Sequence, residues 1–143
     1  MAHKAEQILS SINTSINTIS GVTAERSRFY ALESDQVPFV IVRQGVDSKQ
    51  SEYGNAFVDS LLRVNLVVFV DESSNDFETA LSGIRKDINV KLLTDHSLGL
   101  SFVIDTDEAE AAEPEIIEGN QPRAMQILSY DVLYRRDRIN PEN

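Results

Sequence analysis

The stretch FVDSLLRVNLVVFVDESSNDFETALSGIRKDINVKLL, residues 57–93, decides how this chain folds. In its first part, every second residue from Val64 to Val70 is apolar and the residues between are mixed, which predicts a central strand buried more deeply on one face. A second apolar series follows at steps of four, three, four and four: Phe77, Leu81, Ile84, Ile88 and Leu92. This spacing forms one stripe along an α-helix, so we expect the helix to dock on the strand before it.

The composition predicts one globular domain. A chain of 143 residues buries about two-thirds of its unfolded surface, and 41% hydrophobic with 25% charged residues is ordinary for a soluble protein. No apolar run approaches the ~20 residues that span a bilayer, and the N-terminal residues are too polar for a signal peptide. We expect a single domain over residues 1–143, with a polar C-terminal tail from about residue 139, made in a cytoplasm and with no membrane partner.

Cysteine usage and net charge exclude several classes of function. The chain has no cysteine, so it has neither a disulfide framework nor a thiolate metal site. Its net charge of -10 opposes electrostatic capture of nucleic acid, which needs a basic surface. A like-charged wall repels phosphate, so the same charge is compatible with DNA that passes without binding.

The N-terminal third predicts a helix and two short strands. Residues 2–20 carry apolar side chains at three- and four-residue steps, which predicts an amphipathic helix that Gly21 ends. Strands are expected over residues 28–32 and 39–42.

A polar segment, residues 45–54, separates these strands from the central one. It has glycines at both ends and no apolar periodicity, which predicts a long hairpin loop. Loops longer than a hairpin requires are often functional, so we expect an assembly arm here that includes Lys49 and Tyr53.

The C-terminal third predicts two more strands, around residues 100–105 and over residues 124–134. Helices and strands are therefore grouped, with hairpins in place of repeated strand-helix-strand crossovers. This order predicts an α+β fold, a mainly antiparallel sheet with two helices packed on one face.

Between those strands lies a run of seven acids without a base: Asp105, Asp107, Glu108, Glu110, Glu113, Glu115 and Glu118. Its start is similar to a calcium loop, but an EF-hand needs glycine at the sixth position and glutamate at the twelfth, where this chain has Glu110 and Ile116. We therefore expect no metal, and interpret the run as a solvated or partner-facing acidic segment.

No catalytic signature is present. Asp95, His96 and Ser97 are the residue types of a hydrolytic triad, but adjacent residues rarely meet in triad geometry. The chain also lacks the Walker, GxGxxG, HExxH and GxSxG motifs. We therefore expect no enzyme and no cofactor.

The last predicted strand ends in a basic cluster, Arg135, Arg136 and Arg138. On so acidic a protein, these arginines are expected to pair with carboxylates of another subunit. Acidic and basic patches on one chain favour a head-to-tail ring. The alternative is that the two patches are unrelated faces exposed to solvent. The inter-subunit or lumen acids would include Asp105, Asp107, Glu108, Glu110 and Glu113.

The layout from residue 2 to about residue 138 resembles the tail terminator (tail completion) proteins of long-tailed bacteriophages. The features most similar to that family are Pro38 with Phe39 opening a strand, residues 66–71 with the helix behind them, the turn at residues 95–99, and residues 130–135 in the last strand. The acidic segment before that strand departs from the family pattern.

The resemblance implies a structural virion protein, assembled in the host cytoplasm, that forms a hexameric ring at the head-proximal end of the tail tube. Such a ring ends polymerisation of the tube and offers the head-joining surface. Its partners would be further copies of itself, the tail tube protein and a head-tail connector protein, with DNA passing through unbound. The alternatives are another head-tail connector or minor tail protein, and a small hydrolase that uses His96.

Overall fold

The computed structural model describes residues 3–26, 38–53, 56–71, 77–117 and 123–140. In chain order, its elements are α1 (Lys4–Asn17), β1 (Thr23–Arg26), β2 (Phe39–Tyr53), β3 (Phe57–Asp71), α2 (Phe77–Thr94), β4 (Val103–Ala111), β5 (Glu115–Ile117) and β6 (Arg123–Asp137). The strands form one sheet in the order β1-β2-β3-β6-β4, and β5 also pairs with β6. Among the described strands only β1 and β2 pair in parallel, so the predicted α+β fold with a mainly antiparallel sheet is confirmed.

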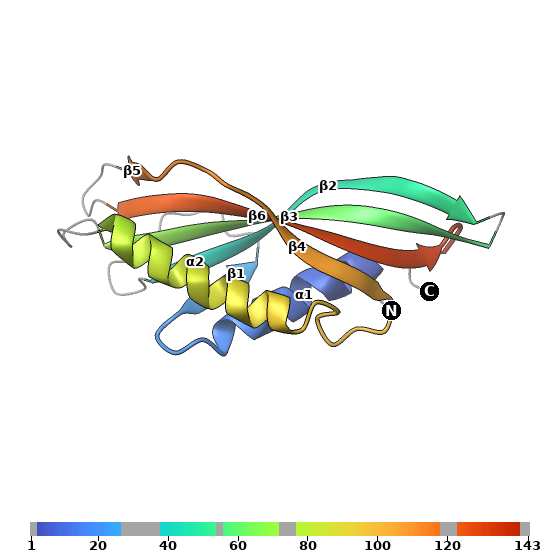
Figure 1. Ribbon diagram of the computed structural model, residues 1–143, viewed down its shortest axis with the longest axis horizontal. Helices are drawn as coiled ribbons and strands as arrows, with labels where there is room; N and C mark the ends of the chain where they lie inside the picture. Colours follow the sequence, from blue (N-terminus) through green and yellow to red (C-terminus); the bar gives the residue numbers. More distant parts are fainter. Residues whose placement is uncertain (1–2, 27–37, 54–55, 72–76, 118–122, 141–143) are drawn as a thin grey trace.

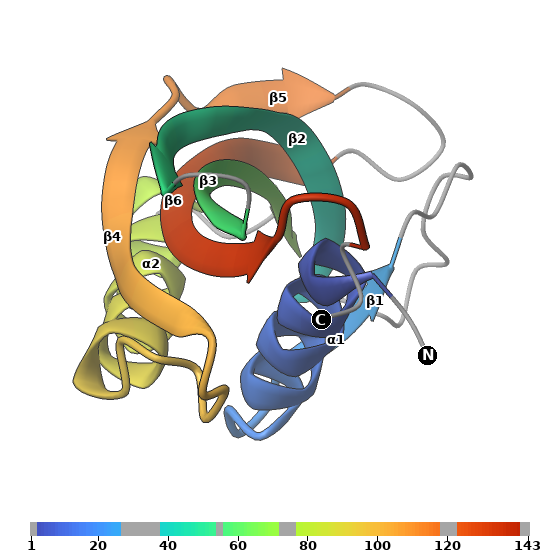
Figure 2. The same ribbon diagram turned by 90° about the vertical axis from the view of Figure 1, so that its right-hand side faces the viewer.

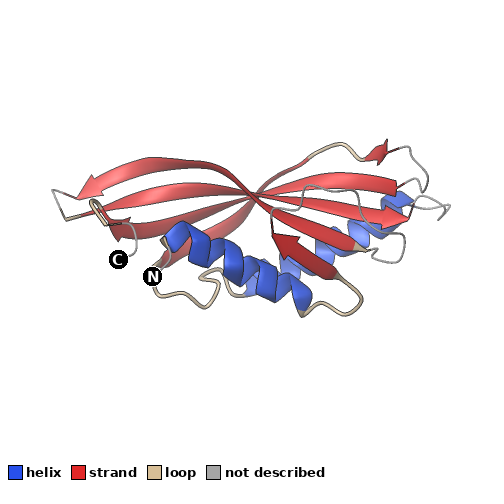
Figure 3. Ribbon diagram, turned by 180° about the vertical axis from the view of Figure 1, so that it is seen from behind, coloured by secondary structure: helices blue, strands red, loops and turns tan. Residues whose placement is uncertain are grey.

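Both helices lie on one face of the strongly twisted sheet (Figures 1 and 3). The view along the strands in Figure 2 shows α1 and α2 side by side on that face. The helices do not cover the whole length of the strands. The end of β2, the start of β3 and the end of β6 extend past them as a three-stranded projection.

The core forms between the helices and the central strand, as the alternation predicts. Val64, Leu66 and Val68 of β3 are buried on the helix-covered face. The predicted stripe of α2 packs against the same core through Leu81, Ile84, Ile88 and Leu92, with Phe77 partly buried at its start. A helix stripe and a strand face thus share one apolar layer.

Helix α1 is shorter than the predicted helix over residues 2–20. It ends at Asn17, whose side-chain amide donates to the Ala24 carbonyl at 3.0 Å and accepts from the Ala24 amide at 2.8 Å. These two bonds turn the chain from α1 into β1. Gly21 lies within that turn at φ +81°, a conformation that favours glycine.

The predicted loop over residues 45–54 is wrong, because β2 continues to Tyr53. Residues 47–53 pair with the start of β3, so they are strand although their side chains are polar. Backbone pairing with β3 does not require apolar side chains on this part of β2. The predicted strand over residues 28–32 lies outside the described residues.

The strands differ in regularity across the sheet. β3 and β6 pair without a register shift from Phe57 opposite Asp137 to Asp71 opposite Arg123. The outer strands β2 and β4 each contain two register shifts against their inner neighbours. Extra residues on the outer strands bend them and increase the local twist.

The acidic run also forms regular structure. The predicted strand around residues 100–105 begins later and is longer, because β4 spans Val103–Ala111 and includes four of the seven acids. The predicted strand over residues 124–134 extends to Asp137, so Arg135 and Arg136 belong to β6.

Ile88→Ala should lower the free energy of unfolding by about 2 to 5 kcal/mol, because the Ile88 side chain is fully buried against the sheet. Urea unfolding followed by circular dichroism measures this change. The matched control is Val90→Ala on the same helix, where the side chain is 58% exposed, and a change within about 0.5 kcal/mol is expected. Equal losses for the two variants would contradict the placement of the α2 stripe.

Candidate functional site

The residue types of a hydrolytic triad do not assemble into one. The Ser97 hydroxyl donates to the Asp95 carboxylate at 2.8 Å, and His96 Nδ1 lies 3.8 Å from Asp105. A triad requires the serine hydroxyl on the imidazole and the imidazole on the carboxylate. Within the described residues, no cluster of His, Cys, Asp and Glu has the geometry to hold a metal ion. The described helices include none long and apolar enough to cross a membrane.

Lys49 lies on the projecting part of the sheet. It is exposed in β2 and pairs in register with Ser60 of β3. Tyr53 is the last residue of β2, opposite Phe57, and its side chain lies outside the described residues. Both predicted arm residues therefore belong to a paired hairpin, which is a stiffer structure than a loop.

A polar row crosses the sheet face away from the helices, at the base of the projection. Arg63 of β3 donates from Nε to Asp131 Oδ1 of β6 at 2.6 Å. Hydrogen bonding to Asp131, and the charges of Asp131 and Glu110, raise the pKa of the Arg63 guanidinium. On β2 the row ends at Gly45, where an added Cβ would lie 2.7 Å from Arg63 Cγ. The glycine therefore lets the arginine lie flat across its neighbour.

Glu108 faces the helices, unlike most of the predicted acidic surface. Arg85 of α2 donates to both of its carboxylate oxygens, at 2.9 Å and 2.8 Å. This hydrogen bonding, followed by the charge of Arg85, lowers the pKa of Glu108. The Glu108–Arg85 pair ties the edge strand β4 to α2 within one chain.

The other predicted acids lie on or beyond β4. Asp107 and Glu110 pair in register with Asp131 and Ser129, whose side chains alternate with the buried face of β6, so both acids belong to the face without helices. Asp105 and Glu113 are exposed, and Glu113 follows the end of β4. The structure therefore separates the predicted acidic surface into Glu108, bound within the chain, and four exposed acids.

The predicted basic surface divides in the same way. Arg135 donates to the buried carboxylate of Asp59 at 2.8 Å and 3.3 Å, and its guanidinium stacks 4.5 Å from the Phe57 ring centroid. Arg136 donates to Ser60 Oγ at 3.1 Å, and Arg138 is exposed just past β6. Arg135 thus has a partner within its own chain that the sequence did not reveal.

Lys4 is a candidate that the sequence interpretation missed. It is the first residue of α1, where the positive end of the helix dipole disfavours a cation. Its ammonium donates to the Arg135 carbonyl at 3.1 Å and lies 4.8 Å from the Phe102 ring centroid. Desolvation lowers the pKa of Lys4, partly offset by the charge of Asp137. The sequence did contain a signal for it, because a lysine is unfavourable at the N-terminus of the predicted helix.

No protein-family model matches the chain, and the comparison with curated proteins gave no match. Among solved structures, the chain is similar to one described as "Virion of native gene transfer agent (GTA) particle". The two share 9% sequence identity with a TM-score of 0.57, and the likeness covers 89% of this chain and 94% of the other. At this identity the similarity establishes a shared fold, over nearly the whole length of both chains.

Glu108→Gln should destabilise the protein in a pH-dependent way. The pKa of Glu108 in the folded state lies below its ordinary value of 4.5. The pair therefore stabilises the fold above pH 4.5, and this contribution is lost as the pH falls through the folded-state pKa. At pH 7 we expect a loss of no more than about 1 kcal/mol, because the pair is partly exposed.

Urea unfolding of wild type and Glu108→Gln across this pH range measures the difference. Asp87→Asn, at an exposed position of α2, is the control, and a change in stability within about 0.5 kcal/mol at pH 7 is expected. If the difference in free energy of unfolding between wild type and Glu108→Gln stays constant down to strongly acidic pH, the stabilisation does not come from the Glu108–Arg85 ion pair.

Proposed function

We propose that this chain is a structural protein of a phage-like virion, and specifically a tail terminator that forms a ring at the head-proximal end of the tail tube. The observation that carries the proposal is the shared fold with a chain of a gene transfer agent virion, which extends over 94% of that chain. The resemblance of the sequence to tail terminator proteins supports the narrower role.

The proposed mechanism is steric and requires no catalysis. One face of the ring binds the last ring of tail tube protein, and the other face offers no equivalent surface, so the next tube subunit cannot add. That second face instead binds a head-tail connector protein. DNA passes through the ring without specific binding, consistent with a net charge of -10.

The three-stranded projection is the proposed contact with the tube or an adjacent protomer. Its central strand β3 pairs with β2 on one side and with β6 on the other, so the projection has a defined shape before it meets a partner. A preformed contact loses less conformational entropy on binding than a loop would. Lys49 and Tyr53 lie on this projection in the strand that forms its outer edge.

The proposed contacts between ring subunits are electrostatic. Asp105, Asp107, Glu110 and Glu113 supply the acidic surface, with Glu108 retained within its own chain. On the basic side, Arg136 and Arg138 are the residues to test, because reversing Arg135 would also leave the buried Asp59 carboxylate without its guanidinium.

Lys49→Glu should leave the protein folded but reduce capping of tail tubes. The test mixes purified tail tube protein from the same virion with wild type or variant, and electron microscopy gives the tube lengths. We expect wild type to sit at one tube end and to shorten tubes several-fold, and Lys49→Glu to lose most of this effect. Lys86→Glu, an exposed reversal on α2, is the matched control and should cap like wild type.

Unaltered tube lengths with wild type would refute the terminator proposal. Wild type found at the other tube end, or only on filled heads, would instead identify another tail or connector protein. If Lys49→Glu caps tubes as well as wild type does, the projection is not the contact with the tube, and the terminator role is unaffected.

The paired reversal of Arg136 and Arg138 to glutamate should weaken the ring. Native mass spectrometry of wild type should give a six-fold multiple of 16.0 kDa, and the variant should shift towards smaller species. Raised salt should produce the same shift in wild type, because charge pairs at the surface are screened. An assembly insensitive to both the reversal and salt would argue against electrostatic subunit contacts.

A further inference from the structure

A pocket lies where the start of α1 meets the start of β4. Its volume is about 500 Å³, and it is lined by Lys4, Ser101, Phe102, Ile104 and Arg135. The lining combines the Lys4 ammonium and a hydroxyl with an aromatic and an aliphatic side chain, while the Arg135 guanidinium is held by Asp59. Such a lining suits an anionic group attached to an apolar one. Its positive charge is local, because the chain as a whole has a net charge of -10.

The Lys4 ammonium gives the pocket its preference for an anion. Its contacts are the Arg135 carbonyl and the Phe102 ring, and the described residues give it no salt bridge. It is partly desolvated and sits at the positive end of α1. Both effects disfavour its positive charge, and the charge of Asp137 offsets only part of the desolvation. A carboxylate that enters the pocket would relieve both costs.

The apolar wall of the pocket is displayed by a bulge. The register of β4 against β6 shifts between Val103 and Asp105, and Ile104 is the extra residue. Bulges re-aim side chains, and Ile104 is 41% exposed although it belongs to a strand. Phe102 packs edge-on against Tyr134 with ring centroids 6.5 Å apart, which holds its ring in place beside Lys4.

A matching group lies at the other end of the same molecule. The segment Glu113-Pro114-Glu115-Ile116 runs from the connection after β4 into the start of β5, with both glutamates exposed and Ile116 47% exposed. Proline restricts its backbone, which lowers the entropy lost on docking. Carboxylates next to an exposed isoleucine complement the Lys4 ammonium next to Phe102 and Ile104.

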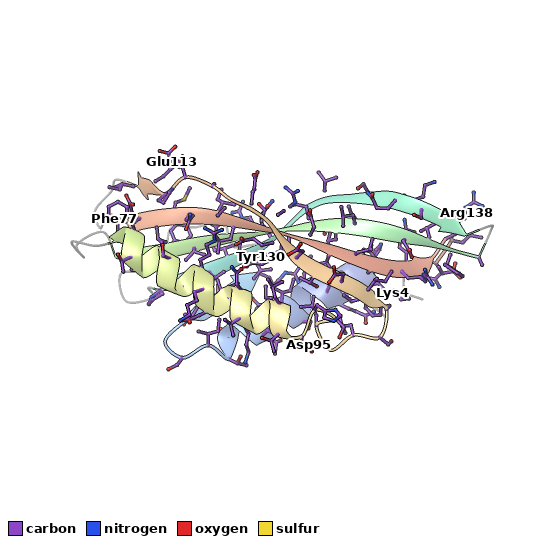
Figure 4. The ribbon with its side chains drawn as sticks, viewed as in Figure 1. Lys4, Phe77, Asp95, Glu113, Tyr130 and Arg138 are labelled. Carbon is purple, nitrogen blue, oxygen red and sulfur yellow. The ribbon has the colours of Figure 1, made fainter. Side chains whose placement is uncertain are left out.

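We propose that the pocket at Lys4 binds the Glu113–Ile116 segment of a second copy of this chain. Figure 4 places Lys4 and Glu113 towards opposite ends of the long axis, so the segment cannot reach the pocket of its own chain. Contact between different patches on two copies is heterologous, which generates rings where the rotation closes. The inference rests on one part of the proposed function, namely that copies of this chain bind one another.

A charge swap tests the contact in the full chain. Lys4→Glu alters only the pocket, and Glu113→Lys with Glu115→Lys alters only the segment. Each variant alone should self-associate about tenfold more weakly, on the scale of a close interfacial charge pair. Mixing the two variants should restore association, because each remaining contact then joins opposite charges. Sedimentation velocity measures all three samples, with Lys86→Glu as the matched control.

A second measurement covers the case in which wild type stays monomeric. The peptide AEPEII, residues 112–117, is titrated into the full-length protein and followed by NMR. Amide signals of Lys4, Ser101 and Ile104 should shift, and the shifts should vanish in Lys4→Glu. Circular dichroism checks that this variant folds. A 12-base-pair DNA duplex is titrated in the same way, and tighter binding of DNA than of peptide at Lys4 would overturn the proposal.

The outcomes separate this contact from the terminator role. A wild-type ring that the charge swap does not weaken, or a mixture that does not recover, overturns the pocket contact and leaves the terminator role standing. Recovery in the mixture from a protein that never caps tubes supports the contact and refutes the terminator role. A monomeric wild type that binds the peptide supports the contact and argues against a ring, and failure to bind the peptide overturns the contact.

Discussion

The register between β3 and β6 is the constraint on which the rest of the structure depends. These strands pair along their whole length without a shift, so every side chain of β3 has its face fixed by β6. A slip of one residue would turn Arg63 and Asn65 into the core. The Arg63–Asp131 ion pair and the Asn65–Ser129 hydrogen bond at 2.8 Å join matched positions across the two strands and favour this register over its neighbours.

This single register serves two different halves of the sheet. Along one half, alternate residues of β3 and β6 face α1 and α2 and form the apolar core. Along the other half, the same strands run past the helices, and polar contacts are added to apolar burial: Val58 and Tyr134 are buried, Tyr134 donates to Asp47 at 2.7 Å, and Arg135 holds Asp59. The helices therefore supply the burial in one half of the sheet, and contacts between the strands themselves supply it in the projection.

Periodicity predicted the parts of the fold that bury apolar side chains. The stripe of α2 and the buried face of β3 could be predicted because burial imposes a spacing on the sequence. Residues 47–53 could not, since a strand exposed beyond the helices has no apolar alternation to reveal it. The intrachain partners of Glu108 and Arg135 were hidden because Arg85 and Asp59 are distant in sequence and only the fold brings them close.

The register shifts in β2 and β4 bear on how readily the exposed strand edges would pair with another strand. Both strands have an edge without a described partner along part of their length, and a flat edge would recruit any other exposed strand. Bulges twist these edges away from the flat geometry that such pairing needs. Bulged edges therefore lower the tendency of copies of this chain to pair through their exposed strands. The irregularity of the outer strands thus protects the fold against aggregation through its edges.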